Sequence, residues 1–126
     1  MSDIIVYESG ELELSVSIDD NNIWLTQKQI AELFDVKVPA ISKHIKNIFS
    51  QNELIESMVV SKMEITTSHG ALTNKFQTKN VNIYNLDIIL SIGYRTNSLK
   101  AIHFRQWFAF SKLDISSIKP MIEKLD

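Results

Sequence analysis

The chain has 126 residues, 44% of them hydrophobic, and carries a formal net charge of -2. This length supports one buried core, so we expect a single domain over residues 1–126 without room for a separate catalytic domain. The sequence has no cysteine, no apolar run near the ~18 residues of a membrane span and no basic residue among its first twenty, which excludes disulfides and disfavours a secretory signal. We therefore expect a cytoplasmic protein.

The first 25 residues alternate between apolar and polar in the manner of β-strands. A turn at Ser9-Gly10 follows the apolar residues 4–7, and from Leu12 to Ile18 every second residue is apolar. A polar turn at residues 19–22 then leads to Ile23-Trp24-Leu25. The pattern predicts an antiparallel meander whose inner face consists of the even-numbered residues 12–18 and whose acidic outer face contacts water.

Residues 25–36, LTQKQIAELFDV, carry the start and stop signals of a short helix. Thr26 is suited to cap its N-terminus, and Gln29 three residues later completes a capping-box pattern. The apolar stripe of this helix ends at Phe34. We expect a second helix to begin near Pro39, because a proline in the first turn lacks only an N–H that has no helical partner there.

The second helix, over residues 39–49, has two different sides. Ile41, Ile45 and Ile48 recur at helical spacing and predict the buried side. The opposite side carries small, cationic or hydrogen-bonding groups, namely Pro39, Ala40, Lys43, Lys46 and Asn47, flanked by Ser42 and His44. Such groups suit base edges and phosphates, so the helix pair favours a DNA-binding helix-turn-helix. The alternative is an ordinary helix surface exposed to water.

Charge is segregated along the chain. Residues 1–24 contain six acids and neither Lys nor Arg, whereas residues 25–49 contain four lysines and two acids. Residues 94–112 contain four basic residues and no acid. Segregation of this kind can give an acidic protein a basic face that attracts phosphates.

A β-hairpin is predicted across residues 58–84, with its turn around Ser68-His69-Gly70. A hairpin directly after a recognition helix is a candidate wing. Lys62, Lys75 and Lys79 would then lie along a phosphate backbone. The same lysines are also typical of a strand edge protected against aggregation.

Two closing helices follow the hairpin. Asn85 predicts the cap of a helix over residues 86–91 that Gly93 ends, and Ser98 predicts the cap of the next. We expect Ile89, Phe104 and Trp107 to pack this pair onto the core. Residues 111–126 are interpreted as the stub of a C-terminal helix. The elements together predict an α+β domain with an N-terminal antiparallel meander, a helix-turn-helix, a wing-like hairpin and a closing helical pair.

The segment YNLDIILSIGYRTNSLKAIHFRQWFAF, residues 84–110, resembles the bacterial RhuM family of virulence and DNA-binding proteins. The resemblance lies in the YNLD, GYR and FRQW elements, and the spacing of the Ser, Ala, Phe-Arg and Trp residues is also similar to viral BRO N-terminal domains and phage antirepressors. With LTQKQIAELFDV included, it covers nearly the whole chain and implies a DNA-binding module. The Phe108-Ala109-Phe110 run departs from the small residues expected after the tryptophan.

Among the basic residues of this segment, Arg95 and Lys100 are candidate phosphate contacts, since a loop entering a helix N-terminus also exposes N–H groups. Arg105 is equally suited to an internal ion pair with Asp87 or a glutamate. Trp107 is expected in the core and not on a base-stacking surface.

No catalytic or metal site is predicted. The three glycines are isolated, histidines 44, 69 and 103 lack ligand spacing, and no serine has a nucleophile-elbow context. We therefore expect neither an enzyme nor a bound cofactor, metal or small-molecule substrate.

The function expected is that of a sequence-specific DNA-binding module, a transcriptional regulator or antirepressor that reads the major groove of double-stranded DNA with residues 39–49, as a monomer or homodimer. The residues predicted to contact DNA are Thr26, Gln27, Lys37, Pro39, Ala40, Ser42, Lys43, Lys46, Asn47, Lys62, Lys75, Arg95 and Lys100. The alternative is a protein interaction module with no DNA role, whose exposed Phe108, Phe110 and Met121 bind another protein or a second copy.

Overall fold

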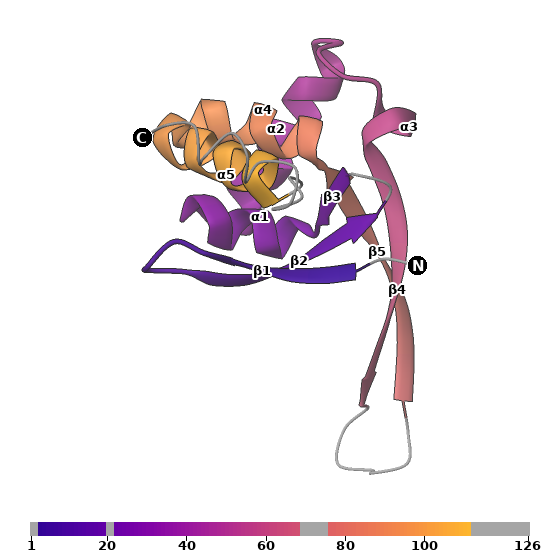
Figure 1. The fold of residues 1–126 in the computed structure, drawn as a ribbon. Coiled ribbons are helices and arrows are strands. Elements are labelled where there is room, and N and C mark those ends of the chain that lie inside the picture. The colour runs from indigo at the N-terminus through magenta and orange to yellow at the C-terminus, as the bar shows by residue number, and fades with distance from the viewer. Residues whose placement is uncertain (1–2, 20–21, 69–75, 112–126) are drawn as a thin grey trace.

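The computed structural model describes residues 3–19, 22–68 and 76–111. It has an α+β fold with one five-stranded antiparallel sheet (Figure 1). In chain order the elements are β1 (Asp3–Glu8), β2 (Glu13–Asp19), β3 (Asn22–Leu25), α1 (Gln27–Phe34), α2 (Val38–Ser50), α3 (Glu56–Val59), β4 (Val60–Ser68), β5 (Phe76–Asn85), α4 (Leu86–Thr96) and α5 (Ser98–Ser111). The predicted α+β class is confirmed, and the predicted elements occur in the predicted order with one additional short helix, α3.

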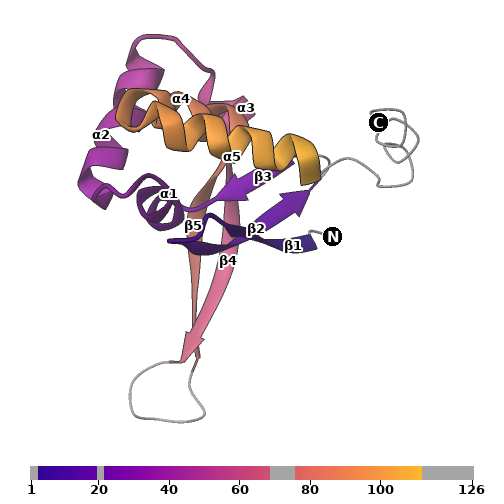
Figure 2. The ribbon, with the colours of Figure 1, turned by 60° about the vertical axis from the view of Figure 1, so that its left-hand side comes forward.

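The strands lie in the order β1-β2-β3-β5-β4. Within the meander Leu14 and Val16 are buried, which confirms the predicted inner face. The β4–β5 hairpin continues this same sheet, because Leu25 on β3 pairs with Tyr84 on β5. Its far part extends beyond the helical layer (Figures 1 and 2), while α5 lies over the β1–β3 part of the sheet.

Local signals set the first helix pair as predicted. The Thr26 side chain accepts a hydrogen bond from the Gln29 N–H, and the Gln29 side chain accepts one from the Thr26 N–H, so the capping box is present. α1 ends at Phe34, and its C-cap residue Asp35 adopts a left-handed conformation with φ 56°. α2 then begins at Val38, with Pro39 in its first turn. The helix pair therefore has a three-residue connection over residues 35–37.

Gly93 does not end α4, contrary to the prediction. The helix continues to Thr96, and Gly93 is buried where α1 and α5 approach. A Cβ added to Gly93 would lie 2.5 Å from Phe34 Cζ and 2.7 Å from Ala101 Cβ. The glycine is therefore required for close packing of helices.

The cap of α5 is also one residue earlier than expected. The Asn97 side chain accepts a hydrogen bond from the Lys100 N–H at 3.2 Å, so Asn97 and not Ser98 caps the helix. Asn85 caps α4 as predicted, by accepting a bond from the Ile88 N–H. The one-turn helix α3 before the hairpin was not predicted; it ends at Val59, which is buried in the core.

The closing helices pack much as expected. Ile89 and Phe104 are fully buried, whereas Trp107 is only half-buried and lies at the rim of the core. There its ring meets Tyr7 edge to face, with 5.0 Å between centroids. Phe108, predicted on an exposed surface, is only 5% exposed and belongs to the core. Its neighbour Phe110 is 67% exposed, as predicted, and Met121 falls outside the described residues.

None of the helices in the described ranges is long and apolar enough to cross a membrane.

Candidate nucleic-acid interface

The outward side of α2 is cationic and contains no acid. Ile41, Ile45 and Ile48 are buried against the core, as the helical spacing predicted. Opposite them, Pro39, Lys43 and Lys46 are exposed, and Ala40 and Asn47 are half-buried at the border of this side. We call Pro39, Lys43 and Lys46 the α2 outer face. Lys37, just before the helix, is exposed as well.

Three residues predicted to contact DNA instead take part in internal hydrogen bonds. Ser42 Oγ on α2 donates to Gln27 Oε1 on α1 at 2.7 Å, and Gln27 Nε2 donates to the Tyr84 hydroxyl on β5 at 2.9 Å. Thr26 is occupied as the cap of α1. These bonds fix α2 relative to α1 and the sheet. Sequence reasoning missed Tyr84, because nothing in the local pattern reveals a partner 57 residues away.

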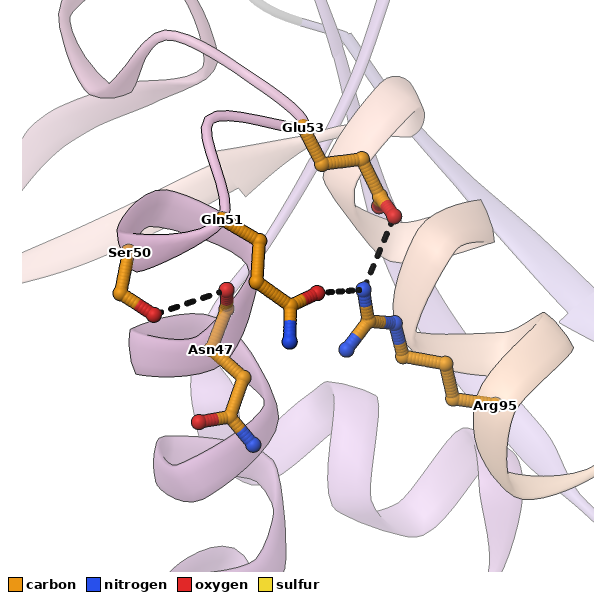
Figure 3. A network of polar contacts seen from close by, with 5 residues as sticks. All are labelled: Asn47, Ser50, Gln51, Glu53 and Arg95. Carbon is orange, nitrogen blue, oxygen red and sulfur yellow. Dashed lines mark hydrogen bonds and ion pairs between the residues drawn. The ribbon is translucent and has the colours of Figure 1, made fainter.

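Arg95 lies in the last turn of α4, two residues before Asn97, which caps α5. Its guanidinium donates to Glu53 Oε1 at 2.8 Å and to Gln51 Oε1 at 3.2 Å, just after the end of α2 (Figure 3). The Arg95 side chain lowers the pKa of the Glu53 carboxyl, and the Ser91 hydroxyl adds to this. A phosphate contact by Arg95 would therefore compete with a carboxylate already in place.

The C-terminal turn of α2 is closed within the same network. Ser50 Oγ donates to the Asn47 carbonyl at 3.1 Å. In Figure 3 the side-chain amide of Asn47 points away from the Arg95 guanidinium. Arg95 thus ties α4 to the end of α2, while the Asn47 amide is directed elsewhere.

Lys100 does not join the α2 outer face. It lies in the first turn of α5 and lines a cleft of about 530 Å³ with residues from β1, the β1–β2 turn and α1, none of them from α2. Arg105, also on α5, is exposed, as is Asp87. Of the two candidate phosphate contacts in this segment, Arg95 is therefore paired with Glu53, and Lys100 lines a cleft that no α2 residue lines.

The lysines of the hairpin point in different directions. Lys62 pairs with Asn82, and Lys79 pairs with Ile65, so the alternation along each strand places the two lysines on opposite faces. Glu64 shares the face of Lys62. Lys75 and the His69-Gly70 turn fall outside the described residues. The described lysines therefore do not make one stripe for a phosphate backbone.

No group of three or more His, Asp or Glu residues within the described ranges is placed to hold a metal ion.

Comparison with protein families gives one match, to the Virulence protein RhuM family over residues 58–119. Residues 58–119 are similar to this family, and we refer to them below as the RhuM-family segment. The match confirms the predicted resemblance across the hairpin and the closing helices, but it begins after α2 and so does not include the helix pair. Neither the curated proteins nor the solved structures gave a match.

The signature residues of the RhuM-family segment have mainly packing roles here. Gly93 and Ala101 bring α4 and α5 together, and Phe104 is fully buried between Tyr7 and Trp107, with ring centroids 5.0 and 5.5 Å away. The matching signature thus explains how this part of the chain folds, and the cationic α2 outer face lies outside it.

Proposed function

We propose that this protein binds double-stranded DNA by placing α2 in the major groove. The observation that carries the proposal is the α2 outer face, where Lys43 and Lys46 are exposed on a helix without acids. The major groove admits an α-helix, and its flanking phosphates attract ammonium groups. The capped helix α1 and the three-residue connection hold α2 in the manner of a helix-turn-helix.

Sequence reading would come mainly from the N-terminal half of α2. Recognition helices contact base edges with their N-terminal residues, which favours Ala40 and Lys43 over Asn47. Lys is suited to the O6 and N7 acceptors of guanine, and the short Ala40 side chain lets the backbone approach the groove. A role as a transcriptional regulator or antirepressor would follow from such binding, without any catalytic step.

A second candidate is a protein interaction module with a helix-turn-helix-like fold. The observation that favours it is the exposure of large apolar residues on α5, Leu99 at 79% and Phe110 at 67%. The two candidates differ in their response to salt, because phosphate binding weakens steeply as salt rises and an apolar contact does not.

The test is a paired titration at fixed salt. A preferred duplex is first selected from a random-sequence pool, and the affinities for that duplex and for random duplex are measured for wild type, Lys43→Ala and Lys62→Ala. Both substitutions remove one positive charge from an exposed lysine, so they form a matched pair. We expect Lys43→Ala to lower affinity for the preferred duplex by about tenfold or more, and for random duplex much less.

We expect Lys62→Ala to change both affinities in the same proportion, as the loss of a phosphate contact does. An equal loss on both duplexes for Lys43→Ala would show that α2 contacts phosphates only. A wild-type protein that selects no duplex and binds none would contradict the whole proposal.

A further inference from the structure

The helix α5 carries large apolar residues on its outward side as well as on its buried side. One side, with Ala101, Phe104 and Phe108, is buried in the core. The outward side still carries Leu99 and Phe110, which are 79% and 67% exposed. Large apolar side chains that lie exposed together on one side of a helix mark an interaction surface.

The outward side has the spacing of a coiled-coil seam. Leu99, His103, Gln106 and Phe110 follow one another at intervals of four, three and four residues. At 100° per residue they fall within one narrow stripe, opposite the buried side. We call these four residues the α5 seam. Its two ends are apolar and its middle is polar.

The α5 seam is complementary to itself in the antiparallel direction. A two-fold axis midway between His103 and Gln106 places Leu99 of one copy against Phe110 of the other, and His103 of one copy against Gln106 of the other. By symmetry each of these pairs occurs twice. Such pairing is isologous and closes at two copies. A polar pair in the middle of a seam specifies register, which a purely apolar stripe does not.

A cleft receives the apolar end of the seam. Leu99, Ile102, Leu12 and Leu33 line the cleft of about 530 Å³ between α5 and the β1–β2 turn. Phe110 is not among its lining residues and lies about 16 Å further along the same side of the helix. Antiparallel pairing therefore brings the Phe110 ring of each copy to the cleft of the other copy.

Charges and hydrogen bonds are compatible with this arrangement. Lys100 and Glu11 line the same cleft, so each end of the pair has one base and one acid, and like charges of the two copies lie at opposite ends. In the middle, His103 Nδ1 is already hydrogen-bonded to the Tyr7 hydroxyl at 2.9 Å. That bond orients the ring and leaves Nε2 for the Gln106 amide of the partner copy.

We propose that the α5 seam is a homodimer interface in which α5 pairs antiparallel with α5 of a second copy, with Phe110 of each seated in the cleft of the other. The proposal does not depend on DNA binding, and either can fail without the other. If both hold, the dimer presents two copies of α2.

Oligomeric state is the first test. Sedimentation of the wild type over a rising concentration series is expected to show a monomer–dimer equilibrium, and Phe110→Asp is expected to weaken it at least a hundredfold. Ile55→Asp is the matched control, since Ile55 is 63% exposed and lies outside the seam. Far-UV circular dichroism of both variants checks that the fold is retained.

Orientation is tested by cross-linking, which is clean because the chain has no cysteine. Disulfides require Cα atoms within about 7 Å. Mixing Leu99→Cys with Phe110→Cys under copper–phenanthroline oxidation is therefore expected to give a two-chain product. Each variant alone is expected to give little, because equal positions lie roughly 16 Å apart in the antiparallel pair.

Three results would overturn the proposal. A wild type that stays monomeric at every concentration would exclude the homodimer. A dimer that survives Phe110→Asp would lie on another surface. Efficient cross-linking of Leu99→Cys with itself would show parallel pairing.

Discussion

The replacement Gly93→Ala tests the packing of α4 most directly. If Gly93 served only to stop a helix, alanine would be tolerated, and if it lay in an ordinary exposed helix, alanine would stabilise the fold by about 1 kcal/mol. The structure gives the opposite expectation. A Cβ would lie 2.5 Å from Phe34 Cζ and 2.7 Å from Ala101 Cβ, which is closer than carbon atoms pack.

The magnitude follows from two opposing terms. Overpacking a well-packed core by one methyl group costs typically about 1–3 kcal/mol, and this contact is at the severe end because Phe34 and Ala101 are themselves buried. The gain in helix propensity from Gly to Ala offsets about 1 kcal/mol. We therefore expect Gly93→Ala to lower the free energy of unfolding by about 2 kcal/mol, measured by urea denaturation with circular dichroism.

A second substitution separates the contact from other effects. Phe34→Leu removes the ring atoms nearest to Gly93 and alone costs stability, because Phe34 is fully buried. In the double mutant the alanine methyl occupies part of the space that the ring leaves. We expect the double mutant to be at least about 1 kcal/mol more stable than the sum of the two single effects allows. Additive effects, or a Gly93→Ala protein as stable as the wild type, would refute the packing role.

Three further predictions concern the hydrophobic core, the proposed DNA interface and the dependence of stability on pH. Phe104→Ala is expected to cost about 3–5 kcal/mol in urea denaturation and half-buried Trp107→Ala about half as much, so equal costs would contradict the rim position of Trp107. If α2 and the residues beside it neutralise about three phosphates, affinity for DNA should fall roughly 40-fold between about 50 and 200 mM salt in a binding titration, whereas a flat response favours the protein interaction module. Because Arg95 lowers the pKa of Glu53, this pair stabilises the fold above the unfolded pKa of about 4.5 and its contribution is lost as pH falls through the lowered folded value. Glu53 is 41% exposed, so the contribution is below about 1 kcal/mol, and thermal melting from pH 3 to 7 should show a slightly weaker acid dependence for Glu53→Gln than for the wild type.

The elements predicted correctly are those specified by neighbours in the sequence. The capping box of Thr26 and Gln29, the proline at the start of α2 and the alternation of the meander act within a few residues, so the chain reveals them directly. The buried side of α2 follows from spacing alone. For the same reason the outward position of Lys43 and Lys46 was predictable.

What the sequence did not reveal depends on contacts between distant residues. In the sequence, Gly93 within a helical pattern suggests the end of the helix. Only the structure shows that Phe34, 59 positions earlier, packs against it. Arg95 is an attractive phosphate ligand until Glu53 is found at 2.8 Å. Ser42 has the spacing of a groove contact, but its hydroxyl donates to Gln27. In each case tertiary packing, which no local pattern encodes, decides the role of the side chain.

The RhuM-family segment and the helix pair share one core, although the family match begins only at residue 58. Phe34 on α1 packs against Gly93 on α4. The Gln27 side chain on α1 donates a hydrogen bond to the Tyr84 hydroxyl on β5 and accepts one from the Ser42 hydroxyl on α2. The position of α2 is thus determined by residues on both sides of the match boundary. A substitution such as Tyr84→Phe can therefore shift the α2 outer face without removing any of the groups that we propose to contact DNA. Loss of DNA binding in such a variant would show only that the orientation of α2 had changed. Substitutions of Lys43 and Lys46, and not of the signature residues of the family, therefore test whether α2 contacts DNA.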